Sequence, residues 1–291
     1  MRSDEEIKKL ILNTAETDPR IRAVILNGSR ANPNAPADKF RDFDIVYYVN
    51  EIESFTCDLS WIDVFGERII LQMPDEMELY PEDADKHRAG FSYLMLFKDS
   101  NRIDLTLYLI DKPEYNYHPE SLSIVWLDKD GLFEGIKPPS DKDHHITKPT
   151  AKLFAETCNE FWWVSTYSAK ALARGEITYV REVTETIIRP MFMRIVNWYI
   201  GCETDFSVST GKGGKFMHKY LSPEVYSKLL LTYPDADIER NKTSLLVMTE
   251  LFSSLAKHAA QKLGYKYNSD EEANVMAYFE SVFKGSSDID T

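Results

Sequence analysis

Two short motifs near the N-terminus combine residue types that bind phosphates and metal ions. Gly28 ends an apolar run and lets the backbone approach a ligand closely, while Ser29 offers a hydroxyl and an N–H to a phosphate oxygen. Asp42 and Asp44 lie two residues apart in a segment typical of a strand, so their side chains point the same way. Because neighbouring carboxylates repel each other, we expect a cation between them, and Mg²⁺ is the hard, oxygen-binding partner of nucleotide phosphates.

A third carboxylate, Asp104, lies in another strand-like segment, NRIDLTLYLI (101–110), on the face opposite the alternating leucines. Three acids and a Gly-Ser turn suit metal-assisted nucleotidyl transfer, in which metal ions neutralise the triphosphate and align the attacking hydroxyl. The third acid can bind a second ion or accept the hydroxyl's proton. A lone Asp-x-Asp pair is common on surfaces, so this prediction depends on the order, spacing and strand context together.

The segments around these motifs alternate as a mixed α and β pattern. We predict an amphipathic helix over 4–17 and strands over 22–28, 42–49, 92–99 and 101–110, the last two antiparallel around a polar turn at Asp99–Asn101. Residues 61–73 fit a helical or irregular piece followed by a strand. The acidic stretch 74–85 suits a cationic ligand, or is a solvated loop.

The second half of the chain changes to helical patterns. Residues 137–149 contain three prolines and form the best linker candidate. Beyond it, apolar residues recur at spacings of three and four over 150–173, 176–200, 222–232, 239–263 and 269–283. Pro190 should kink or break the second of these helices. The predicted fold class is therefore α+β, with a mixed first half and an all-helical second half.

Composition and charge narrow the function classes. The chain has 291 residues and a formal net charge of −13, which repels nucleic acid and anionic membranes. No apolar run is long enough for a transmembrane helix, and the acidic N-terminus does not resemble a signal peptide. Three separated cysteines favour a reducing compartment. We therefore expect a soluble cytoplasmic protein, a monomer or small homo-oligomer, with no nucleic acid or membrane as partner.

The motif GSR…DFD with NRIDLTL downstream resembles the nucleotidyltransferase fold shared with DNA polymerase beta. The whole chain resembles more closely the aminoglycoside 6-adenylyltransferases, the streptomycin-adenylylating family. The matching segments are ILNGSRANPNAP (25–36), DKFRDFDIVYYV (38–49), FGERIILQMPDEMELYP (65–81), LMLFKDSNRIDLTL (94–107), FWWVSTYSAKALARGEI (161–177) and GKGGKFMHKYL (211–221).

This resemblance implies a nucleotidyltransferase domain over 1–145, a helical substrate-binding domain over 146–285 and a flexible tail over 286–291. It implies Mg²⁺-dependent transfer of AMP from ATP to the 6-hydroxyl of streptomycin, a cationic aminoglycoside, with release of pyrophosphate and antibiotic resistance as the result. The metal-ligand roles fall on Asp42, Asp44 and Asp104. Gly28, Ser29 and Arg30 come near the triphosphate.

Residues of the helical half have roles that the resemblance leaves open. Glu182 aligns with an acid of the family and can act as the general base, bind the guanidinium groups of the substrate, or belong to a solvated helix face. Glu185, one helical turn on, shares its face and can help. The loop GKGGKF does not match a Walker A motif, but Lys212 and Lys215 can reach ATP phosphates, or are simply solvated.

Two alternatives to this function remain. One keeps the fold and changes the acceptor to another small molecule or a protein. The other is a catalytically weak homologue that binds ATP without transferring its AMP. The intact Asp42, Asp44 and Asp104 speak against the second alternative, and the glutamate at position 182 speaks for it.

Overall fold

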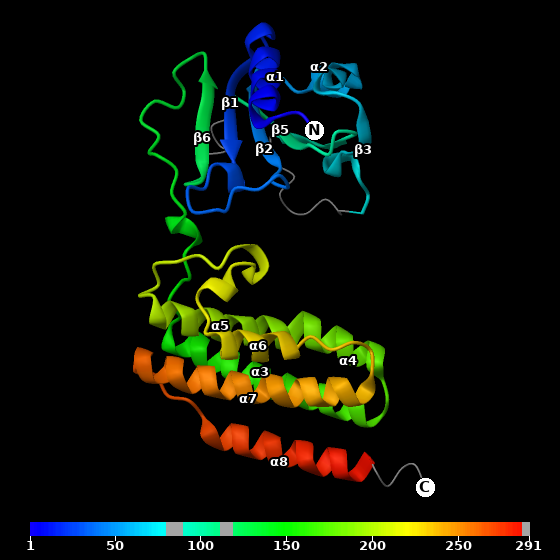
Figure 1. Cartoon of the computed structure of the whole chain (residues 1–291), viewed down its shortest axis with the longest axis vertical. Coiled ribbons are helices and arrows are strands. Elements are labelled where there is room, and N and C mark those ends of the chain that lie inside the picture. The colour runs from blue at the N-terminus through cyan, green and yellow to red at the C-terminus, as the bar shows by residue number, and fades with distance from the viewer. Residues whose placement is uncertain (80–89, 111–118, 287–291) are drawn as a thin grey trace. The chain divides into compact units, whose positions relative to one another are not determined.

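The computed structural model describes residues 1–79, 90–110 and 119–286. Residues 80–85 of the acidic stretch and nearly all of the predicted tail therefore lie outside the described residues. The chain forms two compact units, Met1–Asp143 and His144–Thr291, which are drawn in Figure 1. In the described part of the chain, no helix is long and apolar enough to cross a membrane.

The first unit contains a six-stranded sheet in the order β3-β4-β5-β2-β1-β6 (Figure 1). The strands are β1 (Ile21–Asn27), β2 (Phe43–Val49), β3 (Arg68–Gln72), β4 (Gly90–Phe97), β5 (Arg102–Leu109) and β6 (Ser123–Asp128). β2 and β5 pair in parallel, and the other neighbours are antiparallel. Mixed pairing places the ends of β2 and β5 that carry the aspartates side by side.

One face of the sheet carries the larger core of this unit. Helix α1 (Asp4–Thr17) lies across it, and α2 (Glu53–Thr56) and the 3₁₀ segment Leu59–Phe65 add apolar residues (Figure 1). Ile103, Leu105 and Leu107 of β5 are fully buried there. Since strand residues alternate between faces, the residues between them point to the opposite face.

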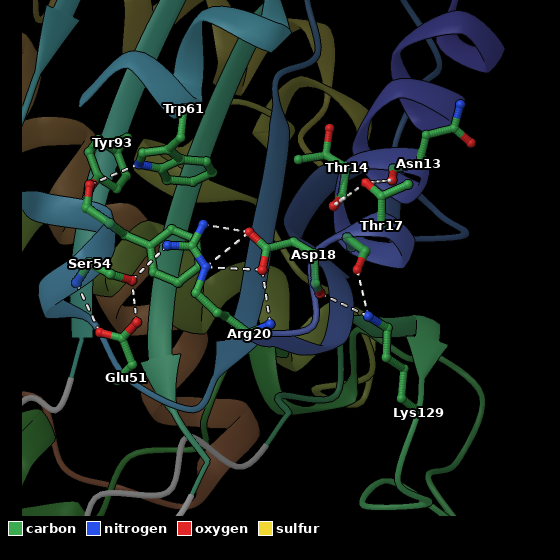
Figure 2. A network of polar contacts seen from close by, with 12 residues as sticks. Asn13, Thr14, Thr17, Asp18, Arg20, Glu51, Ser54, Trp61, Tyr93 and Lys129 are labelled. Carbon is green, nitrogen blue, oxygen red and sulfur yellow. Dashed lines mark hydrogen bonds and ion pairs between the residues drawn. The ribbon is translucent and has the colours of Figure 1, made fainter. Parts of the chain in front are cut away.

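Polar contacts fix the passage from α1 into β1. Figure 2 shows Asp18 and Arg20 bound to each other, with Arg20 continuing to Ser54. Lys129, just after β6, donates to the carbonyls of Ala15 and Asp18 at 2.7 and 3.0 Å. A cation at the C-terminal end of a helix satisfies its unpaired carbonyls and suits its dipole. The network therefore holds α1 at the start of the sheet.

The second unit is helical. Its helices are α3 (Ala151–Ala173), α4 (Ile177–Val183), α5 (Arg189–Glu203), α6 (Pro223–Leu231), α7 (Ile238–Leu263) and α8 (Ser269–Ser286). Aromatic residues fill its core, and the rings of Phe161 and Phe252 stack with centroids 3.6 Å apart. The mixed sheet with helices and the following helical region confirm the predicted α+β class.

Two details of the elements go beyond the sequence patterns. The predicted interruption at Pro190 takes the form of a π-helical turn over Thr184–Ile188 between α4 and α5, and Pro190 lies in the first turn of α5. Strand β6 was not predicted at all. Its pairing with β1 covers what would otherwise be an open sheet edge.

Candidate active site

One row of residues crosses the sheet on the face opposite α1, with one residue from each strand. The successive partners are Gln72, Leu94, Asp104, Asp44, Asn27 and Ser123, from β3, β4, β5, β2, β1 and β6. We call this the carboxylate row and its side of the sheet the carboxylate face. The parallel pairing of β2 with β5 places Asp44 directly opposite Asp104. Asp42 precedes β2 by one residue and shares the face of Asp44.

A guanidinium joins the outer two carboxylates. Arg102 donates from Nε and Nη2 to the two oxygens of Asp104, each at 2.7 Å. Its Nη1 lies 3.7 Å from Oδ2 of Asp42. A bidentate pair of this kind is among the stronger charge-assisted contacts in proteins. Arg102 therefore supplies positive charge where three carboxylates gather.

The positive charge of Arg102 does not fully offset the burial of Asp44 and its repulsion by the neighbouring acids. Burial, with added repulsion from Asp104 and Asp42, raises the pKa of the Asp44 carboxyl to about 6. Burial also raises the pKa of Asp42, although Arg102 opposes that rise. The ionised form of Asp44 is thus unfavourable in the folded protein, and an added cation would stabilise it.

Gly28 touches the same carboxylate. Its φ is +71°, and a Cβ placed on it would stand 2.3 Å from Oδ2 of Asp44. Only glycine fits such a backbone turn so close to a side chain. The following 3₁₀ turn, Gly28–Arg30, presents the half-buried Ser29 beside β1. The predicted phosphate-binding turn therefore lies next to Asp44.

Arg30, which is predicted to lie near the triphosphate, makes several contacts within the first unit. Its guanidinium donates to the carbonyls of Asp42 and Arg41 at 2.9 and 2.8 Å, pairs with Asp4 and lies over the Phe43 ring. These contacts hold the approach to β2 against the Gly28 turn. In this structure the side chain orders the loop that carries Asp42.

The donor set suits a hard divalent cation, because all three acids offer oxygen ligands. Among the described residues, however, no three His, Cys, Asp or Glu side chains are arranged as a complete metal site. The Arg102 guanidinium stands in for a cation between Asp104 and Asp42. The oxygen donors therefore suit Mg²⁺ in chemistry, and Asp44 is the acid beside the Gly28 turn.

The predicted residues of the helical unit fall into two groups, one in α4 and the π-helical turn after it and one around the 3₁₀ turn Lys212–Gly214. Glu182 is exposed on α4, whereas Glu185 of the π-helical turn is paired with Arg189 at 2.6 Å and Arg181 at 3.3 Å. Both glutamates line a cavity of about 440 Å³. Lys212 and Lys215 are exposed in and after the 3₁₀ turn Lys212–Gly214.

Comparison with known proteins agrees with this geometry. The sequence model of the streptomycin adenylyltransferase family matches residues 1–282. The chain belongs to this family. An aminoglycoside 6-adenylyltransferase of Bacillus subtilis (strain 168) is 39% identical over 97% of this chain and 99% of its own length. One from Campylobacter jejuni is 42% identical over 92% of this chain and 91% of its own.

A crystal structure of an aminoglycoside 6-adenyltransferase from Bacillus subtilis aligns with 97% of this chain and 99% of its own, at 36% identity and a TM-score of 0.47. Membership of the streptomycin adenylyltransferase family confirms the predicted family and the predicted enzyme class, a nucleotidyltransferase.

Two features of this family member's site were missed by sequence reasoning. Arg102 lies two residues before Asp104, and that i−2 spacing on a strand was the available signal for a cation on the same face. Ser123 donates to Oδ1 of Asn27 at 2.6 Å and closes the row at its other end. Recognising that contact required knowing that β6 pairs with β1.

Proposed function

We propose that the chain transfers AMP from ATP to a hydroxyl of a cationic aminoglycoside, with streptomycin and its 6-hydroxyl as the specific acceptor, and releases pyrophosphate in a Mg²⁺-dependent reaction. The observation that supports it is the carboxylate row beside the Gly28 turn. The names of the relatives support the acceptor class. The expected consequence is antibiotic resistance, and a reaction that uses ATP suits the predicted cytoplasmic location.

The acids and the Gly28 turn have distinct tasks in this proposal. Asp42 and Asp44 would hold Mg²⁺, which neutralises the triphosphate and polarises the α-phosphorus when bound. The turn at Gly28 and Ser29 would receive phosphate oxygens through its backbone N–H groups and the Ser29 hydroxyl. Arg30 keeps Asp42 and the turn in position through the two carbonyls that it binds.

The acceptor oxygen forms its new bond to the α-phosphorus while the bond to the pyrophosphate oxygen breaks. Its proton then goes to a carboxylate, and Asp104 and Glu182 are the two candidates. Asp104 already belongs to the row, and Glu182 is exposed on α4. We assign the nucleotide chemistry to residues 1–145. To residues 146–285 we assign a part in binding the substrates, with Glu182 and Glu185 for the acceptor's cations and Lys212 and Lys215 for phosphates.

The test is pyrophosphate release from ATP and Mg²⁺, with and without streptomycin. Asp42→Asn should abolish streptomycin-dependent release and leave the circular dichroism spectrum unchanged. Asp38→Asn is the matched control, because this exposed aspartate lies four residues earlier and outside the row. Streptomycin-dependent release that survives Asp42→Asn would refute the assignment of the metal ligands.

An acceptor panel separates the alternatives. Release with another small molecule or a protein, and none with streptomycin, would keep the reaction and replace the acceptor. Tight binding of ATP and Mg²⁺ with no transfer to any acceptor would favour the non-catalytic homologue. In that event Glu182→Asp is the first variant to make.

A further inference from the structure

A cavity of about 700 Å³ lies on the carboxylate face, over the β3–β4 half of the sheet. Its apolar lining comes from β3, β4 and the segment after β3, namely Ile70, Leu71, Met73, Met77, Leu94 and Leu96. The volume falls within the range of small-molecule sites, roughly 300–1,000 Å³.

This cavity continues directly from the carboxylate row. Leu94, in its lining, is the cross-strand partner of Asp104, and Leu96 is the partner of Arg102. Arg102 belongs to both, since it lines the cavity and binds the Asp104 carboxylate. With neighbouring strands about 4.8 Å apart, the cavity begins one strand beyond Asp104.

The order of the strands gives the cavity a place in the reaction. Gly28 and Ser29 follow β1. Asp42 directly precedes β2, Asp44 belongs to β2 and Asp104 to β5, and the cavity lies at β4 and β3. In phosphoryl transfer, the attacking and leaving oxygens lie roughly in line on opposite sides of the phosphorus. If the pyrophosphate leaves on the β1 side, the acceptor hydroxyl must approach from the side of β5 and β4.

We propose that this cavity holds the hydroxyl-bearing ring of the acceptor, a cationic aminocyclitol or amino sugar. The proposal rests on the proposed function. The apolar lining can pack against the C–H face of such a ring, and Gln72 can meet its hydroxyls. The exposed Glu76 at the cavity can pair with a guanidinium or ammonium group. Arg102 lines the cavity and also binds the Asp104 carboxylate, so it marks the boundary between the two.

Two adjacent residues of β3 provide a matched pair for the test. Ile70 lines the cavity and Ile69 does not, although their exposed fractions are 61% and 60%. Ile70→Trp should raise the KM for streptomycin about tenfold, a change of about 1.4 kcal/mol, because the indole fills the cavity. The KM for ATP and the dissociation constant of a fluorescent ATP analogue should stay at wild-type values. Ile69→Trp should behave as wild type in all three measurements.

A second variant keeps the test decisive if Ile70→Trp folds poorly. Glu76→Gln removes one exposed charge and should raise the KM for streptomycin about three- to tenfold, with ATP binding unchanged. Streptomycin binding by calorimetry should weaken by the same factor.

The outcomes distinguish the two proposals. An active wild type in which both cavity variants leave the streptomycin KM unchanged would overturn this inference and leave the proposed function intact. An active wild type in which Ile70→Trp weakens ATP binding instead would assign the cavity to the nucleotide and also overturn it. A wild type that neither binds nor adenylylates any aminoglycoside would overturn the proposed function first, and this inference with it.

Discussion

Replacing Asp44 by asparagine should stabilise the metal-free protein while abolishing transfer. The pKa of Asp44 is raised to about 6. The ordinary value in an unfolded chain is about 3.9, and one unit corresponds to about 1.4 kcal/mol. The ionised carboxylate therefore costs the folded state about 3 kcal/mol at pH 8. Asparagine has the same shape and carries no charge, so this cost disappears.

The sign of the pH dependence follows from the direction of the shift. Below about pH 4 the carboxyl is protonated in both the folded and the unfolded chain, and the substitution should change little. The gain in stability should grow between about pH 4 and pH 6, because in that range Asp44 ionises in the unfolded chain but stays protonated in the folded wild type. Above about pH 6 the carboxylate is ionised in both states and the gain keeps its full size.

Hydrogen exchange of the β2 and β5 amides measures this effect in the sheet unit alone. In EDTA at pH 8, the amides of Asp44→Asn should report an opening free energy about 3 kcal/mol above wild type. Saturating Mg²⁺ with ATP should narrow or reverse the difference, since only the wild type gains a bound cation. An equal or lower opening free energy for the variant in EDTA, or a difference independent of pH, would refute the reasoning.

Three other substitutions test separate features of the fold. Gly28→Ala should lower the free energy of unfolding by about 1–3 kcal/mol and remove transfer activity. Gly135 also has a positive φ but open space around it, so Gly135→Ala should cost less stability and keep activity. Equal behaviour of the two variants in thermal denaturation and pyrophosphate release would contradict this. Asp99→Asn should lower the free energy of unfolding at pH 7 by about 1–3 kcal/mol, because Arg2 and Asn101 hold the pKa of Asp99 well below its usual range. Read from urea midpoints, this loss of stability should shrink as the pH falls below about 4. A loss that stays constant with pH would refute this cause. Arg189→Met should cost about 2–4 kcal/mol in urea unfolding, because it removes the two contacts to the Glu185 carboxylate and leaves the buried Thr232 carbonyl without its guanidinium donor. A loss under about 0.5 kcal/mol would show that these contacts are dispensable.

Local rules predict which face of the sheet the acids share. The i, i+2 spacing of Asp42 and Asp44 and the leucine alternation around Asp104 predict one common face, and the strand pairing sets Asp44 opposite Asp104. Neither pattern reveals that β2 and β5 are neighbours, because that parallel pair joins segments far apart in the chain. The predicted cluster of acids therefore lacked Arg102, whose contact with Asp42 depends on that pairing.

The helical half shows the limit of residue-by-residue reasoning in another way. Periodicity predicted the helices, but a single proline rule could not anticipate the π-helical turn before Pro190. The helical spacing of Glu182 and Glu185 predicts a shared face, and both line one cavity, but it does not predict that Glu185 is paired with Arg181 and Arg189. The pairing depends on the buried position of Arg189, which helical spacing alone does not give.

The parallel pairing of β2 and β5 also governs when the acidic site can form. The two strands cannot meet until the chain between Val49 and Arg102 has closed as a loop, and such non-local contacts are slow to form. The row is completed only when Ser123 joins Asn27. The electrostatic penalty of bringing Asp44 and Asp104 together therefore belongs to the same pairing that buries Ile45, Leu105 and Leu107 in the core.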